Sequence, residues 1–108
     1  MIGRRLPVVD GKPSWPERPG DYSGPVMGYT GDRPAVFFLK PNARDADAPR
    51  YARSTQHIVS PPHSWTEEQD GTLTVHGSIG DFHRDAGSAG GESDGWHGYL
   101  ERGVWRKV

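Results

Sequence analysis

The stretch that decides the fold is residues 95–108, GWHGYLERGVWRKV. Two aromatic-rich runs flank residues 101–103, and a three-residue loop that ends in glycine is typical of a β-hairpin closed by a glycine bulge. A loop at these residues pairs Leu100 with Val104 across the two strands. The sequence therefore predicts an antiparallel hairpin at this end of the chain.

The predicted hairpin has two different faces, because side chains alternate across a strand. The face expected to line the core carries Trp96, Leu100, Val104 and Val108. On the other face Tyr99 pairs with Trp105, and such a cross-strand aromatic pair contributes up to about 1 kcal/mol. Trp, Tyr and Arg are also enriched in protein-binding hot spots. We therefore predict a docking surface formed by His97, Tyr99, Trp105, Arg106 and Lys107.

The rest of the sequence also favours short strands over helices. Only 32% of residues are hydrophobic, and 15 Gly and 10 Pro interrupt almost every segment. Residues 35–39 are the only continuous apolar run, which predicts a central strand buried on both faces. Residues 64–79 predict a second hairpin, in which a loop at 69–71 places Trp65 opposite Val75. With so few aliphatic residues, we expect a small aromatic core.

These patterns predict an all-β fold, a small antiparallel sandwich or open barrel of four to six short strands. The β domain is expected to span residues 35–108, preceded by an extended arm at residues 1–34. The arm contains six prolines and six glycines, and each proline removes a backbone donor. Its composition fits a floppy tail, a segment held by its own domain, or a segment held by a neighbouring subunit. We favour the neighbour, with Trp15, Tyr22 and Tyr29 as contact residues.

Charge and cysteine content exclude several functions. The formal net charge is −1, which does not favour nucleic acid or an anionic membrane as a partner. The chain has no cysteine, so disulfides, thiolate zinc sites and cysteine nucleophiles are excluded. No apolar signal core or membrane-spanning run is present in the sequence. We expect a soluble protein that is made in a cytoplasm.

Histidine is the one reactive residue type with suggestive placement. His76, His83 and His97 could in principle hold Zn²⁺, Fe²⁺ or Mn²⁺ together with nearby aspartates. Their spacing matches no known ligand motif, so we favour ordinary polar histidines and predict no cofactor. Ser78 near these histidines lacks the surroundings of a nucleophile elbow. The sequence therefore favours a protein that is not an enzyme.

The second half of the chain resembles an uncharacterised small domain family of tailed phages and prophages. In that family a Trp-containing strand leads to a Thr-hydrophobic-x-Pro-Ser-Ile element. A loop follows, and a Trp/Cys-His-x-Tyr/Phe-hydrophobic-x-x-Gly-hydrophobic hairpin closes the domain. The matching positions lie within residues 64–108 and are Trp65, residues 73–79 (LTVHGSI), residues 95–100 (GWHGYL) and residues 103–105 (GVW). This chain departs from the family in having Gly77 where proline is usual and in lacking cysteines. The resemblance implies a viral origin, but it does not imply a particular activity, because the role of the family is not established.

Together these observations predict a non-enzymatic, protein-binding structural or accessory component of a tailed-phage particle. Head decoration, head completion and connector proteins are the types that we expect, with capsid or other virion subunits as partners and a possible homo-oligomer. The first alternative is a small phage inhibitor of a host defence or regulatory protein, acting through the predicted docking surface or residues 80–95. The second is a metal-dependent hydrolase that uses His76, His83 and His97.

Overall fold

The computed structural model describes residues 1–28, 31–80 and 95–108. These residues form short β-strands and one 3₁₀ helix, and they contain no α-helix, so the predicted all-β class is confirmed. The elements are β1 (Arg5–Leu6), β2 (Val8–Val9), β3 (Lys12–Pro13), β4 (Tyr22–Val26), β5 (Ala35–Phe38), η1 (Arg50–Arg53), β6 (Gln56–Val59), β7 (Ser64–Glu67), β8 (Leu73–His76), β9 (Ile79–Gly80), β10 (His97–Glu101) and β11 (Val104–Lys107).

The central sheet has the strand order β1-β4-β5-β6. All four residues of β5 are buried, because this strand has a neighbour on each side and layers on both faces. This confirms the central strand predicted from the only continuous apolar run. β1 runs parallel to β4, and the other pairs are antiparallel. The sheet thus contains strands from both sides of the predicted boundary at residues 34 and 35.

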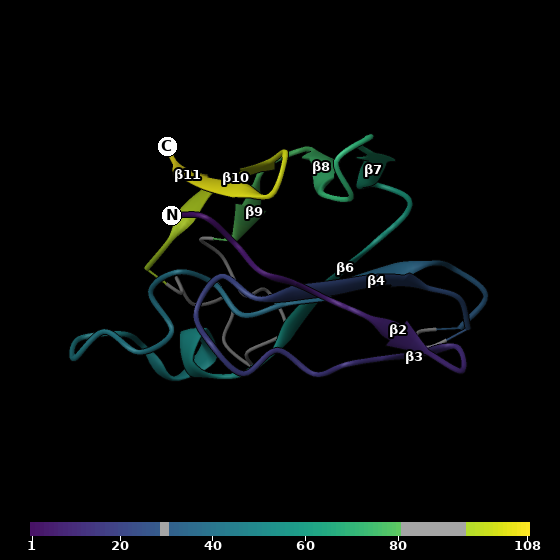
Figure 1. The fold of residues 1–108 in the computed structure, drawn as a ribbon. Coiled ribbons are helices and arrows are strands. Elements are labelled where there is room, and N and C mark those ends of the chain that lie inside the picture. Colours follow the sequence, from purple (N-terminus) through teal and green to yellow (C-terminus); the bar gives the residue numbers. More distant parts are fainter. Residues whose placement is uncertain (29–30, 81–94) are drawn as a thin grey trace.

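Other strands cover both faces of this sheet (Figure 1). Above it in the view lie the β7–β8 hairpin and a second sheet with the order β11-β10-β9, which we call the C-terminal sheet. Below it lies the small β2–β3 hairpin. The N-terminal end extends the C-terminal sheet, because Ile2 pairs with Val104 of β11.

The main core lies between the central sheet and the layer above it, and it is largely aromatic. The Trp105 ring lies 5.6 Å from Phe38 and 5.5 Å from Trp96, measured between centroids. Trp105 also donates its indole N–H to the Gly20 carbonyl at 2.8 Å, which satisfies its one polar group. The buried members are Tyr22, Val36, Phe38, Ile58, Leu73, Val75, Ile79, Trp96, Leu100 and Trp105.

The β7–β8 hairpin has the register that the sequence predicts. Trp65 pairs with Val75, and the N–H of Glu68 donates to the carbonyl of Thr72 across the loop at residues 69–71. Val75 is buried and Trp65 packs against the same core. The Asp70 carboxylate accepts from the Thr72 N–H and hydroxyl, which stabilises the turn locally.

The β10–β11 hairpin forms as predicted, but its predicted register is wrong by one residue. Leu100 pairs with Trp105, and Glu101 pairs with Val104. The loop has two residues, Arg102 and Gly103, with φ angles of 48° and 73°. Positive φ at both positions is the type I′ geometry that matches the twist of a two-residue hairpin.

The shift in register exchanges the two faces of β11. Trp105 turns inward and is 3% exposed, whereas Val104 and Val108 turn outward. Burying the indole removes far more apolar surface from water than burying a valine would. The sequence signal failed because arginine rarely adopts positive φ, so a longer loop looked more favourable.

The predicted extended arm is not confirmed. The described residues before position 29 form β1 to β4 and the strand-like pairing of Ile2. The Met1 ammonium group donates to the Trp105 carbonyl at 3.1 Å, and the Gly3 N–H donates to the Gly103 carbonyl at 2.7 Å. The radius of gyration of 13.2 Å matches the value of about 13 Å for a compact domain of this length. These residues therefore pack on their own domain.

Candidate protein-interaction surfaces

One exposed surface that carries apolar side chains on a regular backbone is the outer face of the C-terminal sheet. Ile2, Val104 and Val108 are 84%, 42% and 70% exposed. Ile2 and Val104 are direct partners, and the Val108 N–H donates to the His97 carbonyl at 2.8 Å. We define the outer face as Ile2, His97, Tyr99, Glu101, Val104, Arg106 and Val108, which share one side of the strands by alternation.

The charged groups of the outer face neutralise one another. Arg106 donates from Nε and Nη2 to Glu101 Oε1 at 2.9 and 2.6 Å. Its Cζ atom also lies 5.1 Å from the centroid of the Tyr99 ring, within the range of a cation–π contact. The face therefore offers apolar side chains around a neutral, polar centre, a composition found at interfaces between proteins.

The adjoining sheet edge is partly closed. The backbone N–H and C=O of Trp105 point away from β10, and Met1 pairs with both. The Trp105 N–H donates to the Met1 carbonyl at 2.8 Å, and the Met1 ammonium group donates to the Trp105 carbonyl. Charged Arg106 and Lys107 follow on the same strand. Charged residues on an edge oppose the addition of a further strand, so a partner is expected on the face rather than at the edge.

Three predicted docking residues, His97, Tyr99 and Arg106, lie together on the outer face. Two others are not available to a partner, because Trp105 is 3% and Tyr22 0% exposed. The prediction was wrong for both residues for the same reason, because each ring lies in the core between the two sheets. In a chain with few aliphatic residues, large aromatic side chains fill the core, and a buried side chain cannot contact a partner.

The remaining predicted contact residues lie elsewhere. Trp15 is 49% exposed and packs edge-on against Phe37, with the ring centroids 5.3 Å apart. It belongs to the opposite side of the central sheet, because Phe37 is in the smaller cluster with Val26 and Ala35. Tyr29 lies outside the described residues. Sequence reasoning missed Ile2, Val104 and Val108, which a two-residue loop at Arg102-Gly103 would have revealed in part.

The histidines named as metal candidates do not form a described cluster. His76 lies on β8, where its Nε2 atom is 2.8 Å from the Thr66 hydroxyl. His97 lies on the outer face of β10, and His83 is outside the described residues. Within residues 1–28, 31–80 and 95–108, no group of three histidines or carboxylates could hold a metal ion.

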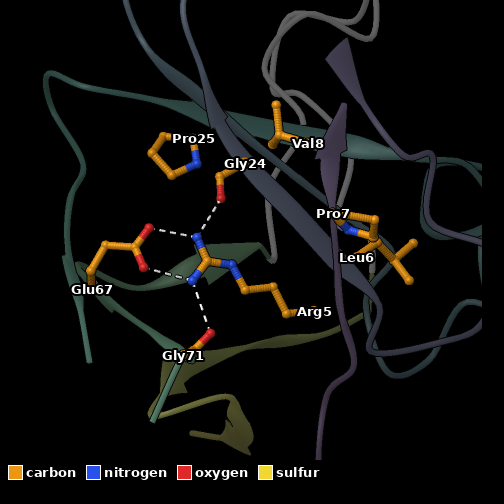
Figure 2. A pocket seen from close by; sticks show the side chains of 8 residues that line it. All are labelled: Arg5, Leu6, Pro7, Val8, Gly24, Pro25, Glu67 and Gly71. Carbon is orange, nitrogen blue, oxygen red and sulfur yellow. Dashed lines mark hydrogen bonds and ion pairs between the residues drawn. The ribbon is translucent and has the colours of Figure 1, made fainter. Parts of the chain in front are cut away.

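A second surface feature is an open groove of about 590 Å³ beside the edge strand β1 (Figure 2). Its floor is the Arg5 guanidinium, which Figure 2 shows facing Glu67, with the Gly24 carbonyl on one side and the Gly71 carbonyl on the other. Arg5 Nη1 donates to Glu67 Oε2 at 2.7 Å and to the Gly71 carbonyl at 2.9 Å. Nη2 donates to Glu67 Oε1 at 2.5 Å and to the Gly24 carbonyl at 2.8 Å.

The Arg5–Glu67 pair remains ionised at neutral pH. The hydrogen bond that Arg5 donates to Glu67 holds the pKa of Glu67 below its ordinary value. The same bond raises the pKa of Arg5. Since the two residues are 62 positions apart, no local sequence pattern could indicate this groove. Its lining residues are Arg5, Leu6, Pro7, Val8, Gly24, Pro25, Glu67 and Gly71.

Comparison with known proteins adds no relative to this description. No family model, curated protein or solved structure matches the chain. Among the described residues, the structure contains no helix with the length and apolar character needed to span a membrane.

Proposed function

We propose that this chain is a non-enzymatic, protein-binding component of a tailed-phage particle, and that a virion subunit packs on its outer face. The observation that carries the proposal is the exposure of Ile2, Val104 and Val108 on one side of a regular sheet. Exposed apolar groups that gather on one surface are typical of interaction sites. The resemblance of residues 64–108 to a phage domain family supports a role in a phage particle.

The binding free energy that one outer face can supply favours attachment through many copies of the chain on one particle. Covering the three aliphatic side chains contributes about 5 kcal/mol at usual values for apolar burial. Association of two proteins costs roughly 4–15 kcal/mol in lost freedom. A single outer face therefore supports weak binding. A particle surface with many copies converts weak single contacts into stable attachment through a high effective concentration.

The proposal no longer depends on an arm lent to a neighbour. The described residues before position 29 form backbone hydrogen bonds within their own domain, as the pairing of Ile2 and β1 illustrates. On the outer face, the exposed side chains of Ile2, Val104 and Val108 are the groups that a partner would cover. The experiment therefore tests the C-terminal sheet.

The test uses particles purified from the phage or prophage that encodes the chain. Mass spectrometry should detect the protein at a fixed ratio to the major capsid protein. Val104→Lys should reduce its retention on particles at least about tenfold, because a charge replaces an apolar contact. Glu101 opposite the new lysine preserves hairpin stability.

Met27→Lys is the matched control, because Met27 is 66% exposed and follows β4 on the central sheet. Retention of this variant should stay within about twofold of the parent. Absence of the chain from purified particles would contradict the proposal. Capture of a host defence or regulatory protein through the outer face would also contradict it and would favour the inhibitor alternative.

A further inference from the structure

Residues 1–3 form a short strap along the edge of β11. The Gly3 N–H donates to the Gly103 carbonyl at 2.7 Å, and the Trp105 N–H donates to the Met1 carbonyl at 2.8 Å. The Met1 ammonium group donates to the Trp105 carbonyl at 3.1 Å. These three hydrogen bonds hold the strap, which Figure 1 shows beside the C-terminal sheet.

Little apolar burial adds to these hydrogen bonds. Ile2 is 84% and Met1 56% exposed, so much of both side chains stays in water. Segments held by exposed backbone hydrogen bonds and few buried apolar contacts open locally while the rest of a domain stays folded. The strap therefore has the features of a segment that detaches from β11 on its own.

The chain is fixed again directly after the strap. Arg4 donates from its guanidinium to the Asp21 carboxylate at 3.1 and 2.8 Å. The pivot of an opening motion is therefore at Gly3. A Cβ atom on Gly3 would lie 2.6 Å from the Gly20 carbonyl oxygen and 2.9 Å from Trp105 Nε1, so the closed strap requires glycine at this position.

The state of the strap decides whether the outer face is complete. Ile2 is the most exposed of the three aliphatic residues on that face, and it lies opposite Val104 only while the strap is closed. A partner that covers both side chains binds the closed state more tightly than the open state. A ligand with such differential affinity shifts the equilibrium towards the state that it prefers.

We propose that the strap is a switch that opens and closes locally, and that the partner on the outer face selects its closed state. This inference rests on the proposed function, because it needs a partner that contacts Ile2. The affinity of the chain for that partner is then the intrinsic affinity multiplied by the fraction of chains with a closed strap.

Hydrogen exchange of the free full-length chain tests the opening without a partner. The Gly3 and Trp105 amides should have protection factors at least about tenfold below that of the Leu39 amide, which follows β5 and donates to the Asp21 carbonyl at 2.9 Å. Their exchange should not depend on low concentrations of urea, because a local opening exposes little surface. Equal protection and an equal urea dependence for all three amides would overturn the proposal.

Two glycine variants test the link to the partner on purified particles. Gly3→Ala should hold the strap open and reduce retention at least about tenfold, with the aliphatic residues of the outer face unchanged. Gly71→Ala is the matched control, because it strains a turn glycine with a φ of 85° and meets no atom within 4 Å. Its retention should stay within about twofold of the parent. The Leu39 amide should stay protected in both variants, which shows that the domain is folded.

The switch and the proposed function fail in different ways. If Val104→Lys reduces retention and Gly3→Ala does not, the outer face binds the partner and the switch is overturned. Equal losses with Gly3→Ala and Gly71→Ala would also overturn the switch, because general instability would explain both. If Val104→Lys has no effect, the proposed function fails and the selection by a partner fails with it, whereas the local opening stands on the exchange data alone.

Discussion

Residues 1–28 and the hairpin at residues 95–108 both form β-structure, but different kinds of contact hold them in place. The hairpin forms from alternation and a tight turn that lie within fourteen positions of sequence. The N-terminal residues have strands of only two residues in β1, β2 and β3. Contacts to distant parts of the chain hold them, such as the bonds of Met1 to Trp105.

Charged side chains also join the N-terminal residues to one another and to the rest of the domain. Asp21 is 2% exposed, and Arg4 donates to its carboxylate from Nε and Nη2 at 3.1 and 2.8 Å. The N–H groups of Glu17 and Arg18 donate to the same carboxylate at 3.1 and 2.9 Å. Arg5 joins β1 to the β7–β8 hairpin in a similar way. The comparison teaches that a segment rich in glycine and proline can be ordered by a few satisfied polar groups.

Trp105 joins the two regions, so its removal should have the largest effect. Trp105→Ala should lower the free energy of unfolding by about 3–5 kcal/mol, because the ring packs on Phe38 and Trp96. Tyr99→Ala should cost only about 1 kcal/mol, chiefly its contact with Arg106. Urea unfolding measures both. Equal costs would contradict the observed register, because a three-residue loop would place Tyr99 and Trp105 on one face.

The second prediction compares an ion pair between distant segments with one inside the hairpin. Arg5→Met should cost about 2 kcal/mol, because the carbonyls of Gly24 and Gly71 lose their donor. A double-mutant cycle with Glu67→Gln should give a coupling of about 1 kcal/mol. The cycle for Arg106 and Glu101, which are 61% and 50% exposed, should give less than about 0.5 kcal/mol. A larger coupling in the hairpin would reverse the comparison.

The smallest expected effect is the loss of the stabilisation by Asp21 at low pH. Burial raises the pKa of Asp21, but the hydrogen bonds from Arg4, Arg18 and Glu17 together outweigh it and place the pKa below the ordinary 3.8. The stabilisation is therefore complete above pH 3.8 and is lost as the pH falls through the lower folded-state pKa. Asp21→Asn should cost about 1–2 kcal/mol at pH 7.

Thermal unfolding at several pH values measures this difference. The gap in Tm between the parent and Asp21→Asn should narrow as the pH falls from 4 towards 2. Asp10→Asn is the control, since Asp10 is exposed in the turn between β2 and β3. A gap that stays constant over this range would show that the Asp21 charge does not hold the N-terminal residues.

Much of the fold could be predicted from the sequence where the signal was local. The apolar run at residues 35–39 indicated the central strand, and the Asp70-Gly71 turn indicated the correct pairing of Trp65 with Val75. The register of the last hairpin could not be predicted reliably. Two loop lengths differ there by one residue, and the choice depends on whether Val104 or Trp105 meets the core.

The candidate sites were less predictable than the fold. His97, Tyr99 and Arg106 were expected on a docking surface and do share the outer face. The aliphatic part of that face was missed, because Ile2 reaches it through a pairing more than a hundred residues away in sequence. The groove depends on Arg5 meeting Glu67, and a single sequence carries no signal for such a distant pair.

By itself, the sequence determined the strand-rich class, the aromatic character of the core and the positions of both hairpins, because periodicity and turn chemistry act over a few neighbouring residues. Only the tertiary structure decided which face of β11 is buried and that the glycine- and proline-rich beginning of the chain packs on its own domain. Those outcomes depend on competition for the core and on hydrogen bonds between distant residues. Such interactions become favourable only once the remaining layers are in place.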